Sequence, residues 1–200
     1  MLVLPSALSH ESQHGPQAGC VTTERAPLLA AIAYPNDSYP QTTFERVVVA
    51  CRARGLKLAG VLQRPVSADP ARRCDVALED LMSGHRTELF ERRGAGARGC
   101  RLDLIALTEV SGCLERALRD RPDLLVLNKF GKVESEGRGL LDVIAVALDR
   151  NVPVIIGVPY RNVDCWRQYA GEMAIEFADD TSEIMAWLDQ VCPAGASRAS

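Results

Sequence analysis

Residues 123–139 read DLLVLNKFGKVESEGRG, a short apolar run followed by a charged, glycine-rich segment. The run 124–127 contains no polar residue, which is the pattern of a strand buried on both faces of a parallel sheet. In open α/β sheets, ligands bind just outside the carboxyl ends of the strands. We therefore expect residues 128–139 to form the functional site.

The segment after this strand concentrates charge on a few residues. Lys129 and Lys132 are two of the three lysines in the chain, the third being Lys57, and Arg138 follows them. Ammonium and guanidinium groups can bind the oxygens of an anion. Glu134 is the best candidate for a general base or for a contact with Mg²⁺-bound water, the alternative being an ordinary solvated carboxylate. The predicted site residues in this segment are Asn128, Lys129, Gly131, Lys132, Glu134 and Arg138.

A second basic segment, RRGAGARGCRLD, covers residues 92–103. Its glycines let backbone amides approach an anion closely, while guanidinium groups bind the anion's oxygens. We expect Arg98, Gly99 and Arg101 to contribute to the anion site, the alternative being a solvated loop in an arginine-rich protein. Residues 160–162 follow another strand and are expected to line the same crevice.

Apolar strands alternate with amphipathic helices along the chain. This alternation predicts an α/β fold with a mostly parallel, doubly wound sheet in three layers. Residues 64–103 interrupt the alternation as an excursion, in which a hairpin with a turn at 83–85 is expected. The predicted strands are 28–33, 58–63, 124–127, 154–158 and 174–177.

The predicted domain organisation is simple. A mobile N-terminal tail at residues 1–26 precedes a single α/β domain at 27–191, and residues 192–200 form a loose C-terminal end. We expect a helix after the first strand to begin with a capping box formed by Thr42 and Glu45. Thr108 is expected to cap the next helix, and a further helix is expected from Arg138 onward.

Composition excludes several classes of protein. The chain has 200 residues, of which 47% are hydrophobic and 24% charged, as expected for one soluble domain. A net charge of −3 gives no electrostatic reason to expect nucleic-acid binding. Seven scattered cysteines without a C-x-x-C pair indicate reduced thiols and a cytoplasmic location. No apolar run approaches the roughly 18 residues of a membrane span, so membrane insertion is not expected. Because most soluble oligomers are homo-oligomers, a homo-oligomer is one expected state of the chain.

The region after the first strand lacks a phosphate-binding loop. Residues 34–45 read YPNDSYPQTTFE, without glycine or lysine, so the G-x-x-x-x-G-K-[ST] pattern is absent. The residues NKFG at 128–131 differ from the guanine-reading N-K-x-D motif because Gly131 stands at the position of the aspartate. Both observations weigh against a standard ATPase or GTPase.

Three blocks of the chain resemble a known family. They are GCRLD at 99–103, DLLVLNKFGKVESEGRGL at 123–140 and VPVIIGVP at 152–159. They are similar to a bacterial family of uncharacterised, NTPase-like proteins often encoded beside molybdate-transport genes. The resemblance covers roughly residues 28–190 and implies a connection with molybdenum, which composition does not show.

The chain also distantly resembles P-loop nucleoside triphosphatases whose Walker-B strand ends D-E-x-G-x-x-E. On that comparison Asn128, Lys129, Gly131 and Glu134 take the positions of the aspartate, the first glutamate, the glycine and the final glutamate. The resemblance implies a P-loop-like architecture. The missing phosphate-loop lysine and the asparagine at position 128 depart from that pattern and weigh against hydrolysis.

These observations support three hypotheses about function. The first is an accessory or regulatory protein in molybdenum handling that binds an oxyanion, either molybdate, tungstate or the phosphates of a nucleotide, with a protein partner in the same process. The second is an active nucleoside triphosphatase that uses Glu134 and Mg²⁺ brought with the nucleotide, without a metal site of its own. The third is a non-catalytic interaction module on a relic nucleotide-binding fold. Tetrahedral oxyanions are chemically alike at this level, so the sequence does not separate molybdate from phosphate.

Overall fold

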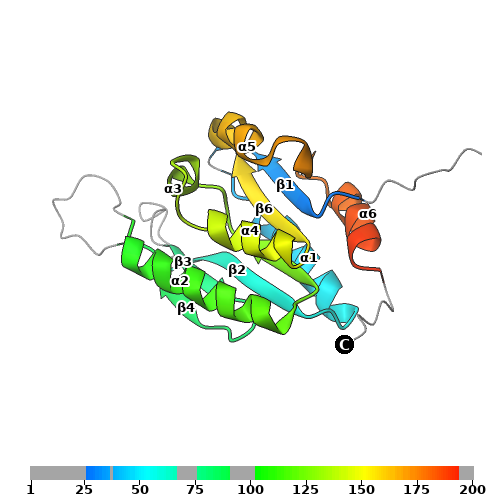
Figure 1. Ribbon diagram of the computed structural model, residues 1–200, viewed down its shortest axis with the longest axis horizontal. Coiled ribbons are helices and arrows are strands. Elements are labelled where there is room, and N and C mark those ends of the chain that lie inside the picture. Colours follow the sequence, from blue (N-terminus) through cyan, green and yellow to red (C-terminus); the bar gives the residue numbers. More distant parts are fainter. Residues whose placement is uncertain (1–25, 37, 67–75, 91–101, 194–200) are drawn as a thin grey trace, which may run out of the picture.

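A computed structural model describes residues 26–36, 38–66, 76–90 and 102–193 (Figure 1). In this part of the chain, seven strands form one sheet in the order β4-β3-β2-β5-β6-β1-β7. Residues 1–25 of the predicted tail and residues 194–200 of the predicted C-terminal end lie outside the described residues. The strands are β1 (Leu29–Tyr34), β2 (Leu58–Pro65), β3 (Val76–Asp80), β4 (Arg86–Glu88), β5 (Leu124–Leu127), β6 (Val154–Pro159) and β7 (Ala174–Phe177).

Most of the sheet is parallel. The pairs β2–β5, β5–β6, β6–β1 and β1–β7 are all parallel, whereas β3 pairs antiparallel with β2 and β4 antiparallel with β3. The predicted mostly parallel α/β sheet is therefore confirmed. The predicted hairpin is also confirmed, and it extends the sheet beyond β2.

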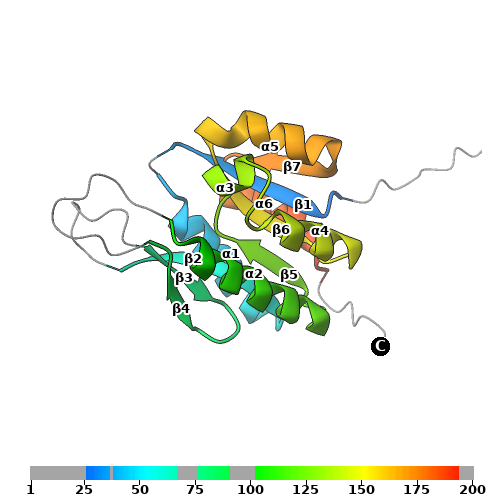
Figure 2. The ribbon, with the colours of Figure 1, turned by 60° about the vertical axis from the view of Figure 1, so that its left-hand side comes forward.

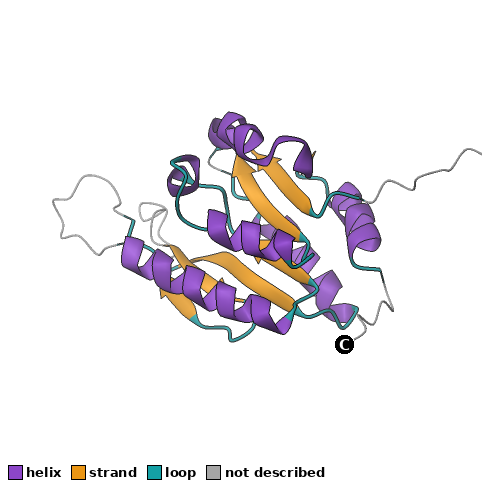
Figure 3. Ribbon diagram, in the orientation of Figure 1, coloured by secondary structure: helices purple, strands orange, loops and turns teal. Residues whose placement is uncertain are grey.

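Helices cover both faces of the sheet (Figures 2 and 3). Residues of α2, α4 and α5 belong to one buried cluster, and residues of α1 and α6 belong to the other. The expected three layers, helix on sheet on helix, are present. The helices are α1 (Gln41–Ala53), α2 (Leu104–Ala117), α3 (Lys132–Ser135), α4 (Leu141–Asp149), α5 (Val163–Ala170) and α6 (Thr181–Val191).

Strand β5 lies at the centre of the sheet, and all four of its residues are fully buried. Leu125 and Leu127 pack in the cluster that contains α2 and α4, whereas Leu124 and Val126 pack in the cluster that contains α1 and α6. Alternate residues of a strand point to opposite faces, so an apolar run suits a strand covered on both sides. Each such burial stabilises the fold by roughly 1.5–3 kcal/mol, which holds the end of β5 in place.

The first helix does not begin with the predicted capping box. Helix α1 begins at Gln41 after Pro40, and no side chain caps its first turn. The carboxylate of Glu45 instead accepts hydrogen bonds from the side chains of Gln41 and Arg64. The capping box expected from Thr42 and Glu45 was wrong, because the guanidinium group of Arg64 in β2 binds the carboxylate of Glu45.

The second helix, α2, is capped five residues before the predicted capping residue, Thr108. Asp103 caps α2, and its Oδ1 accepts hydrogen bonds from the amides of Ile105 at 2.9 Å and Ala106 at 3.0 Å. Thr108 lies inside the helix, where its hydroxyl donates to the carbonyl of Leu104. The prediction of Thr108 as the cap was wrong because aspartate, an equally good capping residue, stands earlier in the chain.

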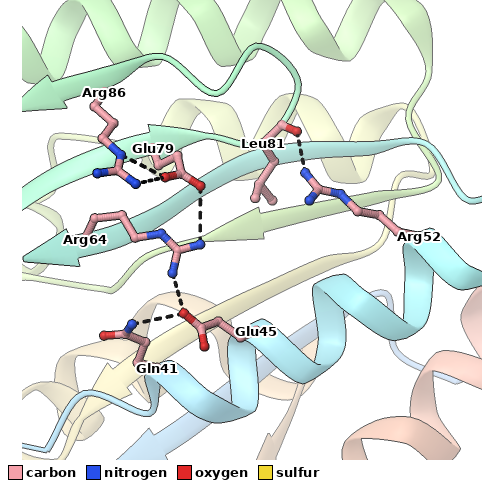
Figure 4. A network of polar contacts seen from close by, with 7 residues as sticks. All are labelled: Gln41, Glu45, Arg52, Arg64, Glu79, Leu81 and Arg86. Carbon is pink, nitrogen blue, oxygen red and sulfur yellow. Dashed lines mark hydrogen bonds and ion pairs between the residues drawn. The ribbon is translucent and has the colours of Figure 1, made fainter.

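A network of ion pairs attaches the antiparallel extension to the rest of the sheet (Figure 4). Arg64 of β2 contacts Glu45 of α1, and its Nη2 lies 3.3 Å from Oε1 of Glu79 in β3. The other carboxylate oxygen of Glu79 lies 2.7 Å from Nη2 of Arg86 in β4. Arg64 therefore links β2 to helix α1 and to strand β3 by ion pairs.

The same contacts lower the pKa values of both carboxyl groups. For Glu45 the largest cause is the hydrogen bond from Gln41, reinforced by Arg64. For Glu79, burial favours a higher pKa, but hydrogen bonds from Arg64 and Arg86 outweigh burial and lower it. A carboxyl group whose pKa is lower in the folded state stabilises the fold above its unfolded pKa, and this contribution is lost as the pH falls through the folded pKa.

We therefore expect Arg64→Met to flatten the acid side of the stability profile. Wild-type protein should lose stability below the ordinary carboxyl pKa of 4.5, and the variant should lose less because its glutamates keep more normal pKa values. At neutral pH the variant should be less stable by about 1 kcal/mol, since partly exposed ion pairs contribute little. Urea unfolding between pH 3 and 7 (roughly spanning the carboxyl titration) measures both effects. Arg167→Met, which breaks the exposed pair with Glu176, is the control, and equal acid slopes in wild type and Arg64→Met would contradict the prediction.

Candidate functional site

A pocket of about 210 Å³ lies at the carboxyl ends of β5 and β6. The chain leaves β1 toward the face that carries α1, and it leaves β6 toward the opposite face, which carries α5. In open α/β sheets, ligands bind at the carboxyl ends of the strands next to such a divergence. Arg161, which follows β6 and contacts Asn36 after β1, lines this pocket. The polar residues that line the pocket are Asn128, Lys129, Lys132, Glu134, Arg161 and Asn162.

Phe130 anchors the segment that follows β5. Its amide donates to the carbonyl of Gly157 at 2.7 Å, and its carbonyl accepts from Nδ2 of Asn162 at 2.7 Å. Its buried ring lies 5.5 Å from the ring of Trp166 and 6.1 Å from that of Tyr169, measured between centroids. Because these contacts fix Phe130 on both sides, the neighbouring Lys129 is attached to a rigid backbone.

Glu134 closes the segment between β5 and α4. Its side chain is buried, with Oε2 accepting from the amide of Gly131 at 2.9 Å and Oε1 accepting from the amide of Leu140 at 3.1 Å. Gly139 has a φ of +73°, and a Cβ at that position would lie 2.2 Å from Oε1 of Glu134. The alternative of a solvated carboxylate is thus wrong, and the predicted role as a general base stays a prediction.

The loop around Glu134 also changes the predicted helix. A short helix, α3, occupies residues Lys132–Ser135, and α4 begins only at Leu141 rather than at Arg138. Gly137 and Gly139 both have positive φ, which interrupts a helix on either side of Arg138. The predicted start at Arg138 was wrong because Glu134 binds the amide of Leu140 and holds this turn open.

The two remaining cations of the segment lie away from the centre of the pocket. The side chain of Lys132 is 88% exposed at the rim, 3.8 Å from Glu136. Arg138 binds Glu136 at 2.6 Å and lines a different depression beside α2 and α4. The structure therefore brings Asn128, Lys129 and Gly131 together in one pocket, but it separates Arg138 from them. The amide of Gly131, which was expected to face an anion, already donates to Glu134.

Lys129 is a cation whose surroundings disfavour its charge. Lys129 is half-buried, and this burial, followed by the positive charge of Arg161, lowers its pKa, while the negative charge of Glu134 acts in the opposite direction. Within the described ranges Lys129 makes no ion pair. A buried cation without a paired anion is unfavourable unless a ligand supplies the missing charge.

Arg161 is held at the pocket by the turn that follows β1. Its amide donates to Oδ1 of Asn36 at 2.7 Å, and its guanidinium makes a longer contact of 3.5 Å with the carbonyl of Asn36. The sequence indicated that residues 160–162 would line the crevice, and Arg161 and Asn162 do so. The role of Asn36 was missed, since an asparagine in a turn is normally explained by local hydrogen bonding.

Asn128 directly follows β5 and is 3% exposed. Its Oδ1 is out of contact with solvent and has no hydrogen-bond partner among the residues that the structure describes. Arg98, Gly99 and Arg101, the other predicted site residues, lie outside the described residues, so their part in the site stays a prediction. Phe90 and Leu102, on either side of that segment, both line the pocket.

The residues of the pocket do not fit a Mg²⁺ ion held by the protein. Mg²⁺ prefers carboxylate and water oxygens, yet both oxygens of Glu134 accept backbone amides, and Lys129 and Arg161 bring positive charge. In the described part of the chain, no group of three or more histidine, cysteine, aspartate or glutamate side chains could hold a metal ion. Any Mg²⁺ would therefore have to be bound mainly by the phosphates of a ligand.

The fold and the pocket place this chain in the class of open α/β proteins with a candidate ligand site at the carboxyl edge of a mostly parallel sheet. The chain belongs to the family described as "Protein of unknown function (DUF2478)", whose model matches residues 29–187. It is also similar to the molybdenum import ATP-binding protein ModC 2 of Bradyrhizobium diazoefficiens, with 32% identity over 162 residues.

That match covers 80% of this chain but only 18% of the ModC 2 protein. No solved structure matches the chain significantly. Among the described helices, none combines the length and the apolar character needed to cross a membrane.

Proposed function

We propose that this chain binds an oxyanion in the pocket beside Lys129 and acts as an accessory or regulatory protein in molybdenum handling. The oxyanion is the phosphate group of a nucleotide, or molybdate or tungstate. The observation that carries the proposal is the burial of Lys129 next to Arg161, without an ion-pair partner in the described residues. An anion placed between these two cations would relieve their repulsion and favour the charged form of Lys129.

The order of the strands supports a P-loop-like architecture. Taken in chain order, the five parallel strands are arranged 2-3-4-1-5 across the sheet, which is neither the dinucleotide-binding nor the flavodoxin-like order. Strand β6 lies between β1 and β5, so the strand before the expected phosphate loop and the Walker-B-like strand are not neighbours. Together with the resemblance of residues 128–134 to a Walker-B segment, this order supports a P-loop-like architecture as our preferred interpretation.

The turn after β1 favours binding over hydrolysis. This turn lacks the glycines and lysine of a phosphate loop, and the ring of Tyr39 packs there on Phe44, with centroids 5.5 Å apart. The name of the similar ModC 2 protein links it to ATP and to molybdenum import, which supports a nucleotide or molybdenum ligand here. Two alternative functions are an active Mg²⁺-dependent triphosphatase that uses Glu134 and a protein-interaction module that binds no small ligand.

A thermal-shift panel tests the proposal. The purified chain is heated with molybdate, tungstate, sulfate, phosphate, ATP or GTP, each with and without Mg²⁺. A ligand at about 100 times its Kd adds about 2.7 kcal/mol of stability, which should raise Tm by several degrees. We expect stabilisation by at least one oxyanion without Mg²⁺. Absence of any shift would contradict the proposal and leave the interaction module as the better hypothesis.

A further inference from the structure

Asn128 presents an unused hydrogen-bond acceptor at the candidate site. The residue is 3% exposed and lines the pocket, and its Oδ1 has no partner in the described part of the chain. The backbone of Asn128 packs closely against the adjacent strand, since a Cβ added at Gly157 would lie only 2.8 Å from the Asn128 carbonyl oxygen. A buried acceptor without a donor is costly to the fold, so a native site that keeps one calls for an explanation.

The other polar groups of the pocket are either donors only or already hydrogen-bonded. Lys129 and Arg161 carry only donors, and no carboxylate in the described residues pairs with Lys129. The amide of Asn162 is already engaged by the Phe130 carbonyl, and Glu134 is engaged by two backbone amides. The pocket thus offers two cationic donors, and Oδ1 of Asn128 is the buried side-chain acceptor of its described lining that still needs a hydrogen.

A ligand that satisfies these groups must carry negative oxygens and at least one hydroxyl. Inorganic phosphate keeps a P–OH group at neutral pH, and a phosphomonoester keeps one below its second pKa of about 6. Sulfate, molybdate and tungstate carry no hydrogen near neutral pH. Their oxygens would face the Asn128 oxygen with lone pair against lone pair, which leaves the buried acceptor unsatisfied.

We propose that the pocket selects protonated phosphate over hydrogen-free tetrahedral oxyanions. Oδ1 of Asn128 accepts the P–OH hydrogen, while Lys129 and Arg161 bind the charged oxygens. This inference rests on the proposed function, that the pocket binds an oxyanion, and it names which oxyanion. A site that hydrogen-bonds a ligand hydroxyl discriminates strongly against analogues that lack it.

Isothermal titration calorimetry at a pH near 6.5 (close to the phosphomonoester pKa of about 6) tests the selectivity. The full chain is titrated with phosphate and arsenate, which carry a hydroxyl, and with sulfate, molybdate and tungstate, which do not. AMP is included to distinguish the phosphate of a nucleotide from free phosphate. We expect phosphate, which keeps its hydroxyl at this pH, to bind at least about tenfold more tightly than sulfate or molybdate.

Two substitutions at position 128 distinguish the effect of the hydrogen-bond acceptor on phosphate binding from the effect of charge. Asn128→Leu should weaken phosphate binding by about tenfold or more and leave sulfate binding unchanged or tighter, because it removes the acceptor. Asn128→Asp should keep the preference for phosphate, because a carboxylate is also an acceptor, and should exclude sulfate further by repulsion. Chemical unfolding of both variants checks that they fold. If Asn128→Leu does not fold, phosphate and sulfate binding are compared in Asn128→Asp instead.

The outcomes distinguish this inference from the proposed function. Equal affinity of wild type for phosphate and sulfate or molybdate would overturn the selectivity while leaving oxyanion binding intact. A phosphate preference that survives in a folded Asn128→Leu protein would also overturn it. Failure of every anion to bind would overturn the proposed function itself.

Discussion

Glu134→Ala is expected to unfold the segment that follows β5. The two amides that Glu134 binds, those of Gly131 and Leu140, would lose their acceptor in a buried region. Each buried amide left unpaired costs about 1–3 kcal/mol, so the free energy of unfolding should fall by roughly 2–6 kcal/mol. Because Lys129 lies just before Gly131, oxyanion binding should be lost as well. Urea unfolding and calorimetry measure the two effects.

Glu136→Ala is the matched control for this prediction. Glu136 is two residues away, and its partly exposed carboxylate makes surface pairs with Lys132 and Arg138. Such pairs contribute about 0–1 kcal/mol, so this variant should remain close to wild type. Equal losses of stability in the two variants would show that Glu134 has no special structural role.

Glu134→Gln separates the structural role from the catalytic alternative. A glutamine amide can accept only one of the two hydrogen bonds, so we expect a smaller loss of stability than in Glu134→Ala. If Glu134 were instead the base of a Mg²⁺-dependent triphosphatase, Glu134→Gln would abolish phosphate release while stability and nucleotide binding stayed near wild type. A measured hydrolysis that disappears in this way would favour the enzyme over the binding protein.

Lys129→Met is expected to weaken oxyanion binding strongly and to stabilise the unliganded protein. Removing one partner of a buried charge pair costs about 2 kcal/mol or more, so the Kd should rise by about 30-fold or more. Without ligand, the folded state holds a cation whose pKa is lowered by burial and by Arg161. Methionine fills the same space without the charge, so the free energy of unfolding should increase.

The pH dependence of stability gives a second measurement for Lys129. The unfolded chain binds the lysine proton up to a pKa near 10.5, whereas the folded chain releases it at lower pH. Between the two pKa values the unfolded state carries more protons, so wild-type stability should rise with pH in that window. The variant should lack this rise.

Lys57→Met is the control for both measurements. Lys57 is an exposed lysine outside the pocket, so the substitution is chemically the same but removes no site charge. We expect unchanged oxyanion binding and an unchanged pH profile in this variant. Full oxyanion affinity in Lys129→Met would rule out Lys129 as a binding group.

The strands could be predicted closely because their signal is local. Leu124–Leu127 and Ala174–Phe177 have the bounds that the apolar runs indicated, and the first strand differs by a single residue at each end. The apolar face expected for α1, including Phe44 and Val47, is buried. Side-chain periodicity depends on neighbours two to four residues away, so it can be recognised without the fold.

Helix starts were predicted less well because several residues can cap the same helix. Asp103 and Thr108 are both good capping residues, and the chain uses the first. Glu45 has the correct spacing from Thr42 for a capping box, but Arg64 binds it from β2. A charged group on another element therefore decided between two locally acceptable arrangements.

The candidate site was predicted in part. The position of Asn128 and Lys129 follows from the end of a buried strand, and Arg161 and Asn162 follow from the end of another. The sequence also suggested Glu134 as a functional carboxylate, but it contained no sign that both oxygens would bind backbone amides. Arg138 was grouped with Lys129 by proximity in the chain, and the turn around Gly139 directs it elsewhere.

The sequence by itself determined the class of fold, the strands, the buried faces of the helices and the placement of polar residues after β5 and β6, since all of these depend on local patterns. Only the tertiary structure decided the order of the strands and the contact between Asn36 and Arg161. It also left Oδ1 of Asn128 without a hydrogen-bond partner, and Lys129 without an ion pair, among the described residues. These features arise between residues far apart in the chain. Their energies depend on burial and on which charges meet, and both are set only when the layers pack together.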